Sequence, residues 1–230
     1  MNKVELIELI KDQLGEMRIN QARKHFHPEI IAYTLDKQYW LLLSQAYASD
    51  PYSIDGCLDV SYNVPVYADT NTQDLFSVIP KYVIPLHSVQ GGVWNVKKHG
   101  DSSVKFEPYS SDFENRSWNR LSVNFANTVR FWFDRGAPDT ELSASSASNS
   151  ATFSDYQSLV WFKAETAQLT NDDTVDIKLL PTFYAHGDTQ QVYVPANVGG
   201  VKNLVDVAIG DLLRKLGIQS DYNQRESNEE

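Results

Sequence analysis

The 230-residue sequence is poor in cysteine and in basic residues, and it lacks a long hydrophobic run. Cys57 is its only cysteine, so this chain alone forms neither an internal disulfide nor a cysteine-based zinc site. Lysine and arginine number 20 against 30 acidic residues, and the net charge of −10 disfavours a protein that coats DNA or RNA. Without a secretory signal or a run of about 20 apolar residues, we expect no membrane partner and synthesis in a reducing cytoplasm.

Motifs of catalysis are also missing. The sequence contains no nucleophile elbow, phosphate-binding loop, dinucleotide fingerprint or H-E-x-x-H motif. His25 and His27 precede a helix without a cysteine or carboxylate at ligand spacing, which favours a solvated or hydrogen-bonded pair over a metal site. The remaining histidines are isolated in the sequence: His87, His99 and His186. We therefore predict a protein that is not an enzyme, with no catalytic, cofactor-binding or metal-binding residues.

Aromatic residues are abundant, with twelve tyrosines, ten phenylalanines and five tryptophans. They suit both strands and protein interfaces. Four tryptophans of the β-rich region could also form a sugar-binding platform, although we favour a role in the core and at the edges: Trp94, Trp118, Trp132 and Trp161. Carboxylates for glycoside cleavage are plentiful, but the sequence does not pair them.

The first 50 residues carry two helical patterns. Residues 3–16 predict a helix that Asn2 and Glu5 cap reciprocally. Its expected apolar face consists of Val4, Ile7, Ile10 and Leu14. A second helix is predicted from Pro28 to about Ala48, ending before Asp50-Pro51. Its expected buried stripe consists of Ile31, Leu35, Tyr39, Leu42 and Ala46.

Short alternating runs then indicate strands from Leu58 to about Arg135. The clearest is VRFWFDRG, in which Val129, Phe131 and Phe133 point away from Arg130, Trp132 and Asp134. Residues 75–80 fit a short strand or a turn. Further strands are predicted within 158–167 and 174–183, HGDTQ indicates a turn, and QVYVP at 191–195 indicates a last short strand.

Residues 136–157 are small and polar, with a serine-rich centre. We interpret them as an exposed hairpin tip or a mobile loop. The alternative is an arm that becomes ordered on a neighbouring subunit. In that case the contact residues are Ser143, Ser145, Ser146 and Ser148.

The chain closes with an amphipathic helix over about 201–216, followed by a helix stop at Gly217 and a flexible acidic tail. The helix is expected to anchor the fold or a seam between subunits through Leu204, Val205 and Leu212. Asp221 and Tyr222 are the tail residues expected to reach a partner.

These patterns predict an α+β fold, in which the N-terminal helices and the C-terminal helix pack together around an inserted antiparallel β-sandwich or barrel-like domain. The predicted segments are a helical segment at 1–50, a β region at 51–198, the last helix at 199–217 and the tail at 218–230.

Three stretches resemble the neck proteins of short-tailed bacteriophages, particularly the ring proteins of crAss-like phages. They are ARKHFHPEIIAYTLDKQYWLLLSQAY after the first helix, LFSVIPKYVIPLHSVQGGVWNV, and the closing VYVP, spacer, helix and acidic tail. The likeness lies in the layout of the chain, and the serine-rich insertion has no counterpart in it.

The resemblance implies a structural virion protein of the head–tail connector. It implies a ring, with twelve subunits to match a dodecameric portal, that binds the portal and other connector or tail proteins. DNA would pass through its lumen without sequence-specific binding. Two alternatives remain open: another tail-completion or capsid-associated protein, and a carbohydrate-binding β-sandwich module.

Overall fold

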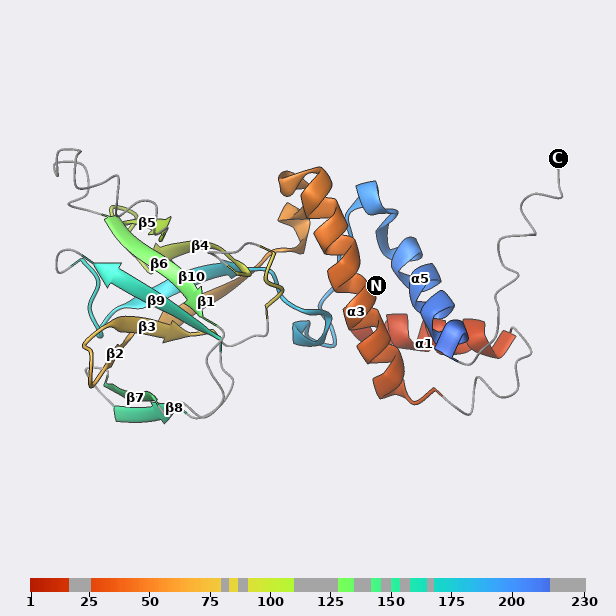
Figure 1. Ribbon diagram of the computed structural model, residues 1–230, viewed down its shortest axis with the longest axis horizontal. Coiled ribbons are helices and arrows are strands. Elements are labelled where there is room, and N and C mark those ends of the chain that lie inside the picture. Colours follow the sequence, from red (N-terminus) through yellow and green to blue (C-terminus); the bar gives the residue numbers. More distant parts are fainter. Residues whose placement is uncertain are drawn as a thin grey trace. The chain divides into compact units, whose positions relative to one another are not determined.

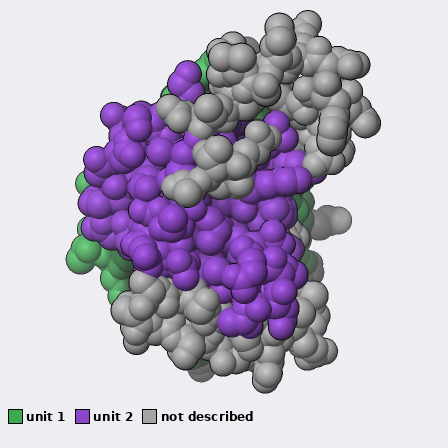
Figure 2. Space-filling model, turned by 90° about the vertical axis from the view of Figure 1, so that its left-hand side faces the viewer, with its two compact units in different colours: residues 1–57, 182–230 green, residues 58–181 purple. Residues whose placement is uncertain are grey.

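A computed structural model describes residues 1–16, 26–79, 83–86, 91–109, 128–134, 142–145, 150–153, 158–164 and 168–215. The chain divides into two compact units, shown in Figures 1 and 2. The helical unit comprises residues 1–57 and 182–230, and the β unit comprises residues 58–181. The β unit is thus inserted between the two parts of the helical unit, which confirms the predicted α+β layout. The helical unit also takes in residues 51–57 and 182–198, which the sequence placed in the β region.

The helical unit contains α1 (Lys3–Glu16), α3 (Pro28–Ser49) and α5 (Gly200–Lys215). Short 3-10 helices accompany them: η1 (Pro51–Cys57), η3 (Phe183–Ala185) and η4 (Ala196–Val198). The predicted capping box of α1 is confirmed, because Asn2 and Glu5 each donate a backbone N–H to the other's side chain at 2.9 Å. Proline occupies the first turn of α3, as predicted.

The three helices bury apolar faces against one another. The stripe predicted for α3 is confirmed, since Ile31, Leu35, Tyr39, Leu42 and Ala46 are all buried. The face predicted for α1 is partly wrong. Its buried residues are Leu6, Ile10 and Leu14, whereas Val4 is exposed, because several apolar residues of α1 compete for one contact face.

The β unit contains ten strands in the described residues: β1 (Asp59–Pro65), β2 (Tyr67–Asp69), β3 (Leu75–Val78), β4 (Val93–Lys98), β5 (Lys105–Pro108), β6 (Thr128–Asp134), β7 (Leu142–Ser145), β8 (Ser150–Phe153), β9 (Leu159–Ala164) and β10 (Thr174–Leu179). One sheet has the order β1-β10-β4, and the other has the order β5-β6-β9-β3-β2-β7-β8. All of these pairs are antiparallel except β5 with β6.

A single apolar core joins the two sheets. It includes Val96 and Ile177 from the three-stranded sheet, and Val129, Phe131 and Phe162 from the seven-stranded sheet. Two sheets that share one core in this way form a sandwich. The predicted sandwich is therefore confirmed, whereas both sheets end in edge strands over the described residues and neither closes into a barrel.

Other strand predictions had mixed outcomes. The alternation predicted for 128–134 is confirmed, although Arg130 is buried together with the core side. The strand predicted at 191–195 is wrong, because apart from an isolated bridge between Asn2 and Gln191 the segment pairs with no strand. Instead it buries Val192 and Val194 in the helical unit, and Pro195 has no N–H for a ladder.

The serine-rich region supplies the hairpin of β7 and β8, which extends the seven-stranded sheet beyond β2. This agrees with the hairpin interpretation of residues 136–157. Parts of the region predicted to form strands, at 80–82, 87–90 and 110–127, lie outside the described residues.

Candidate interaction surface

The central helix α3 is apolar on two opposite faces. One face is buried within the helical unit, as described above. The opposite face carries Ile30, Tyr33, Trp40 and Leu41, which remain 41%, 61%, 46% and 41% exposed. A helix that is apolar all round is normally buried all round. We call these four residues the α3 stripe, and we take it as the candidate interaction surface of the described chain.

The α3 stripe is large for an unoccupied surface. With about 200 Å² for a fully exposed side chain of this size, the four exposed fractions amount to about 400 Å². Apolar patches of about 300–600 Å² are the largest on ordinary monomers and are often functional. Stable complexes between folded proteins bury about 800 Å² on each partner, so the stripe supplies about half of such an interface.

Charged groups of α5 border one side of the α3 stripe. The ammonium group of Lys37, which lies on the same face of α3, is 3.6 Å from the carboxylate of Asp211. Lys215 reaches the same carboxylate at 3.6 Å and donates a hydrogen bond to the Thr34 hydroxyl at 3.0 Å. Its ammonium group also lies 5.9 Å from the centre of the Tyr33 ring. These contacts fix α3 and α5 side by side in antiparallel directions (Figure 1).

The segment around η3 borders the other side. The Tyr184 hydroxyl donates to the backbone carbonyl of Glu29 at 3.5 Å, next to the first turn of α3. Burial and the nearby carboxylates of Asp36 and Glu29 raise the pKa of Tyr184. The Tyr184 ring is 45% exposed, so it extends the apolar surface beside Ile30 and Tyr33.

A buried polar cluster sets the rotation of α3. Asp36 accepts the backbone N–H of Phe183 at 2.8 Å, which ties α3 to η3. Burial raises the pKa of Asp36, against the effect of the backbone hydrogen bonds. Tyr39 packs against His186 and Phe183 through edge-on ring contacts. Because these contacts keep the opposite face of α3 turned toward the core of the helical unit, the α3 stripe faces outward.

The outer face of α1 differs from the α3 stripe in charge. Its exposed residues include the acidic side chains Glu5, Glu8, Asp12 and Glu16. Lys11 pairs with Glu8 at 2.6 Å and offsets only part of this charge. The helical unit therefore has one acidic outer face on α1 and one apolar outer face, with a lysine, on α3.

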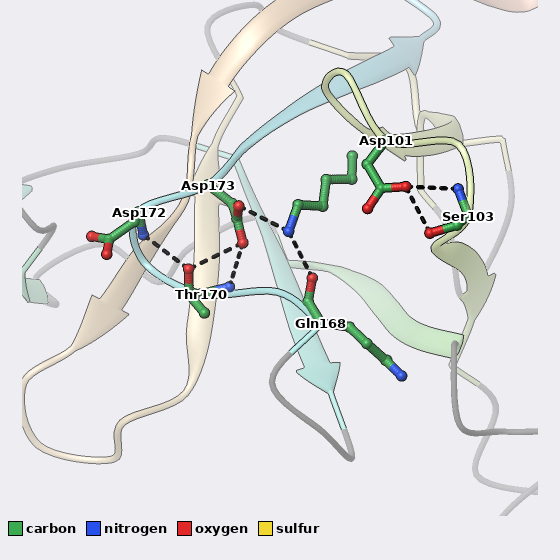
Figure 3. Close-up of polar contacts among 7 residues, drawn as sticks. Asp101, Ser103, Gln168, Thr170, Asp172 and Asp173 are labelled. Carbon is green, nitrogen blue, oxygen red and sulfur yellow. Dashed lines mark hydrogen bonds and ion pairs between the residues drawn. The ribbon is translucent and has the colours of Figure 1, made fainter.

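The β unit contains a second polar cluster, shown in Figure 3. The Lys98 ammonium group of β4 lies 2.9 Å from the carboxylate of Asp173 and donates to the Gln168 carbonyl at 2.9 Å. Asp173 also accepts the backbone N–H of Thr170 at 2.8 Å. Burial raises the pKa of Asp173, but the hydrogen bonds from Lys98 and Thr170 outweigh it and lower the pKa overall. The ion pair and the hydrogen bonds join these groups to one another. The cluster therefore has a structural role and stabilises the turn before β10.

Aromatic rings form a row across the seven-stranded sheet. The ring centres of Tyr109 and Trp132 are 5.5 Å apart, and those of Trp132 and Trp161 are 6.3 Å apart with nearly parallel planes. Phe76 continues the row at 5.0 Å from Trp161, and Tyr67 follows at 5.8 Å. The rings pack chiefly against one another, as cross-strand pairs do.

The four tryptophans considered for a sugar platform therefore do not share one surface in the described chain. Trp132 and Trp161 belong to the aromatic row, Trp94 lies on β4 in the other sheet, and Trp118 is outside the described residues. This arrangement favours the packing role expected from the sequence.

The predicted interaction residues fall in three places. Leu204, Val205 and Leu212 are buried within the helical unit, which fits the role of α5 as an anchor of the fold. Ser143 and Ser145 lie in β7. Ser146, Ser148, Asp221 and Tyr222 are outside the described residues. The α3 stripe is not among the predicted interaction residues, although Tyr33, Trp40 and Leu41 indicate in the sequence that the outer face of α3 is also apolar.

The histidines of the described chain have separate surroundings. His27 lies 3.8 Å from Glu29, and His99 lies 3.0 Å from Asp176. His186 faces Tyr39, while Asp188 pairs with Lys3 at 3.1 Å. His25 and His87 lie outside the described residues. Across the described ranges, no three histidine, cysteine or acidic side chains gather as metal ligands would.

Within the part of the chain that the structure describes, no helix has the length and apolar character required to cross a membrane. No protein-family model, curated protein or solved structure matches the chain.

Proposed function

We propose that the chain is a structural, non-enzymatic subunit that assembles with copies of itself into a ring of the head–tail connector in a short-tailed bacteriophage. The observation that carries the assembly is the α3 stripe, an apolar face that runs along a 22-residue helix and that the described chain leaves open. The connector itself rests on the resemblance in chain layout.

The surroundings of the ring follow from the same proposal. The subunit joins the portal protein to further connector or tail proteins within the virion, and twelve copies match a dodecameric portal. The net charge of −10 suits a lumen through which DNA passes without specific binding, because an acidic wall repels phosphates. The chain is made in the host cytoplasm before it joins the particle.

Native mass spectrometry of the full chain, alone and with a candidate portal protein, tests the proposal. We expect a ring, or a saturating complex with the portal. Replacement Trp40→Ser should raise the dissociation constant of assembly at least tenfold, since aromatic residues dominate such contacts. Tyr62→Ser is the control, because Tyr62 is an aromatic residue that is 69% exposed but belongs to the β unit. A chain that remains monomeric at high concentration and does not bind the portal would contradict the proposal.

A further inference from the structure

The antiparallel packing of α3 and α5 determines where α5 ends along α3. Asp211 lies beside Lys37, and Lys215 lies one turn further on, beside Thr34 and under the ring of Tyr33. The last described residue, Lys215, therefore lies next to the first turns of α3, at one end of the α3 stripe.

The residues that follow are LGIQSDYNQRESNEE, at 216–230. Their apolar side chains, Leu216, Ile218 and Tyr222, all fall within the first seven positions. The remainder is polar and acidic, with Asp221 and three glutamates against the single Arg225. We call residues 216–230 the C-terminal segment. It combines a short apolar stretch with a net negative charge.

We propose that the α3 stripe of one copy binds the C-terminal segment of a second copy. This inference rests on the proposed function and identifies the contact that holds the ring. Each copy donates one segment and receives one, so the contact joins two different patches. Contacts of this kind form closed rings when the rotation between copies divides the circle.

The reach of the segment favours a second copy over its own stripe. Trp40 lies seven residues beyond Tyr33, or about 10 Å along the helix. Ile218 lies three residues beyond Lys215, and a fully extended chain covers about 10 Å in three residues. Reaching Trp40 from Lys215 would require a reversal of the direction of α5, and a turn uses about four residues. Of the three apolar side chains, only Tyr222 therefore lies far enough along the segment to reach Trp40 or Leu41 of its own chain, whereas the segment of a second copy can cover the whole α3 stripe.

Charge directs the segment to α3 and away from α1. The exposed carboxylates on the outer face of α1 would repel the acidic part of the segment. Lys37 lies on the same face as the α3 stripe with its side chain 48% exposed, and Arg214 and Lys215 are exposed at the adjoining end of α5. These basic groups are placed to pair with acidic residues that follow the apolar stretch.

The size of the α3 stripe fits a segment better than a second folded surface. Its area of about 400 Å² is half of what two folded partners bury on each side. Two α3 stripes related by a twofold axis near their centres would also bring Lys37 against its own copy. A short segment with three apolar side chains covers the stripe without that repulsion.

Two complementary variants of the full chain test this contact. The receptor variant carries Tyr33→Ser and Trp40→Ser, and the segment variant carries Leu216→Ser and Ile218→Ser. We expect the unaltered chain to assemble and each variant alone to be monomeric by native mass spectrometry. An equimolar mixture should form a 1:1 heterodimer and nothing larger, because only one intact stripe and one intact segment can meet. Asn228→Ser is the control for the segment, and Trp40→Ser alone is the second receptor variant if the double variant unfolds.

The outcomes separate this inference from the proposed function. A segment variant that still assembles while the receptor variant is monomeric would overturn the inference and leave the ring intact. A mixture that stays monomeric would overturn the inference as well. If the unaltered chain is monomeric at every concentration and does not bind the portal, both proposals fail.

Discussion

The hydroxyl of Tyr39 lies 3.4 Å from Nε2 of His186, and both side chains are buried. The pair joins the middle of α3 to the residue that follows η3, 147 positions later in the chain. Burial, followed by the neighbouring Cys57 and Asp36, raises the pKa of Tyr39 well above its usual value, so the phenol stays neutral. The two parts of the helical unit are thus held together by a polar contact inside an apolar core.

Replacement Tyr39→Phe should therefore destabilise the helical unit. It removes the hydroxyl that faces His186 while it keeps the ring, so we expect a loss of about 1–2 kcal/mol in the free energy of unfolding. Tyr52→Phe is the control, because Tyr52 is 80% exposed and should change the stability by less than about 0.5 kcal/mol. Urea unfolding measures both, and equal midpoints for the two variants would show that the Tyr39 hydroxyl has no structural role.

The thiol of Cys57 should be nearly inert in the folded protein. It is buried, its sulfur lies 3.6 Å from the Tyr193 carbonyl, and burial raises its pKa to about 12. Because the thiolate is the reactive form, little of it exists at neutral pH. We expect slow modification by a thiol reagent at pH 8 and rapid modification in urea. Fast, stoichiometric labelling of the folded protein would contradict this arrangement.

Two leucines of α3 provide a matched test of its faces. Leu43 is fully buried and Leu41 belongs to the α3 stripe. Leu43→Ala should lower the stability of the monomer by about 2–5 kcal/mol, because it leaves a cavity. Leu41→Ala should change it by less than about 0.5 kcal/mol but weaken assembly. Thermal unfolding of dilute protein, together with native mass at high concentration, separates the two effects.

The ion pair of Lys98 and Asp173 should make stability depend on pH. The pKa of Asp173 is lowered in the folded state, so its stabilisation is complete above the ordinary value of about 4. It is lost as the pH falls further through the lowered pKa. Asp173→Asn should cost about 1–2 kcal/mol at pH 7 and progressively less toward pH 2. Asp172→Asn, at the exposed neighbouring carboxylate, should show no such trend, and parallel stability curves for both variants would refute the assignment.

Alanine substitutions at Gly91 and Gly100 distinguish the steric cost of a new side chain from the conformational cost of a positive φ angle. Both have positive φ angles, of 56° and 73°. A Cβ atom at Gly91 would lie 2.1 Å from the Phe133 ring, whereas none lies within 4 Å at Gly100. Gly100→Ala should therefore cost about 1–2 kcal/mol, from the backbone alone. Gly91→Ala should cost about 1–3 kcal/mol more, from the clash with the core. Equal losses in urea unfolding would show that the ring moves aside freely.

Local chemistry explains which elements were predictable. The start of α1 depends on Asn2 and Glu5, three residues apart, and the start of α3 depends on Pro28, so both follow from neighbours in sequence. The buried face of α1 depends on which side meets α3 and α5, and no residue within α1 decides between Val4 and Leu6. The supposed strand at 191–195 failed for a related reason, since alternation requires a neighbouring strand to become a sheet.

The candidate surface, too, was only partly predictable from the sequence. Aromatic and aliphatic residues at 30, 33, 40 and 41 are visible in the sequence, but only the packed helices reveal that they remain outside. The contacts of Lys215 with Thr34 and Tyr33 join positions about 180 residues apart, and no spacing rule predicts them. The ring and its place in a virion stay predictions until the native mass is measured.

The insertion of the β unit also dictates an order of events during translation. Residues 58–181 emerge from the ribosome as one uninterrupted stretch and contain all ten described strands, so the sandwich can fold before synthesis ends. The packing of α1 and α3 is completed later, because α5 supplies part of the surface against which they pack. Until residue 215 has been synthesised, α1 and α3 lack the apolar contacts that α5 supplies. The helical unit is therefore completed only when its last helix has been made.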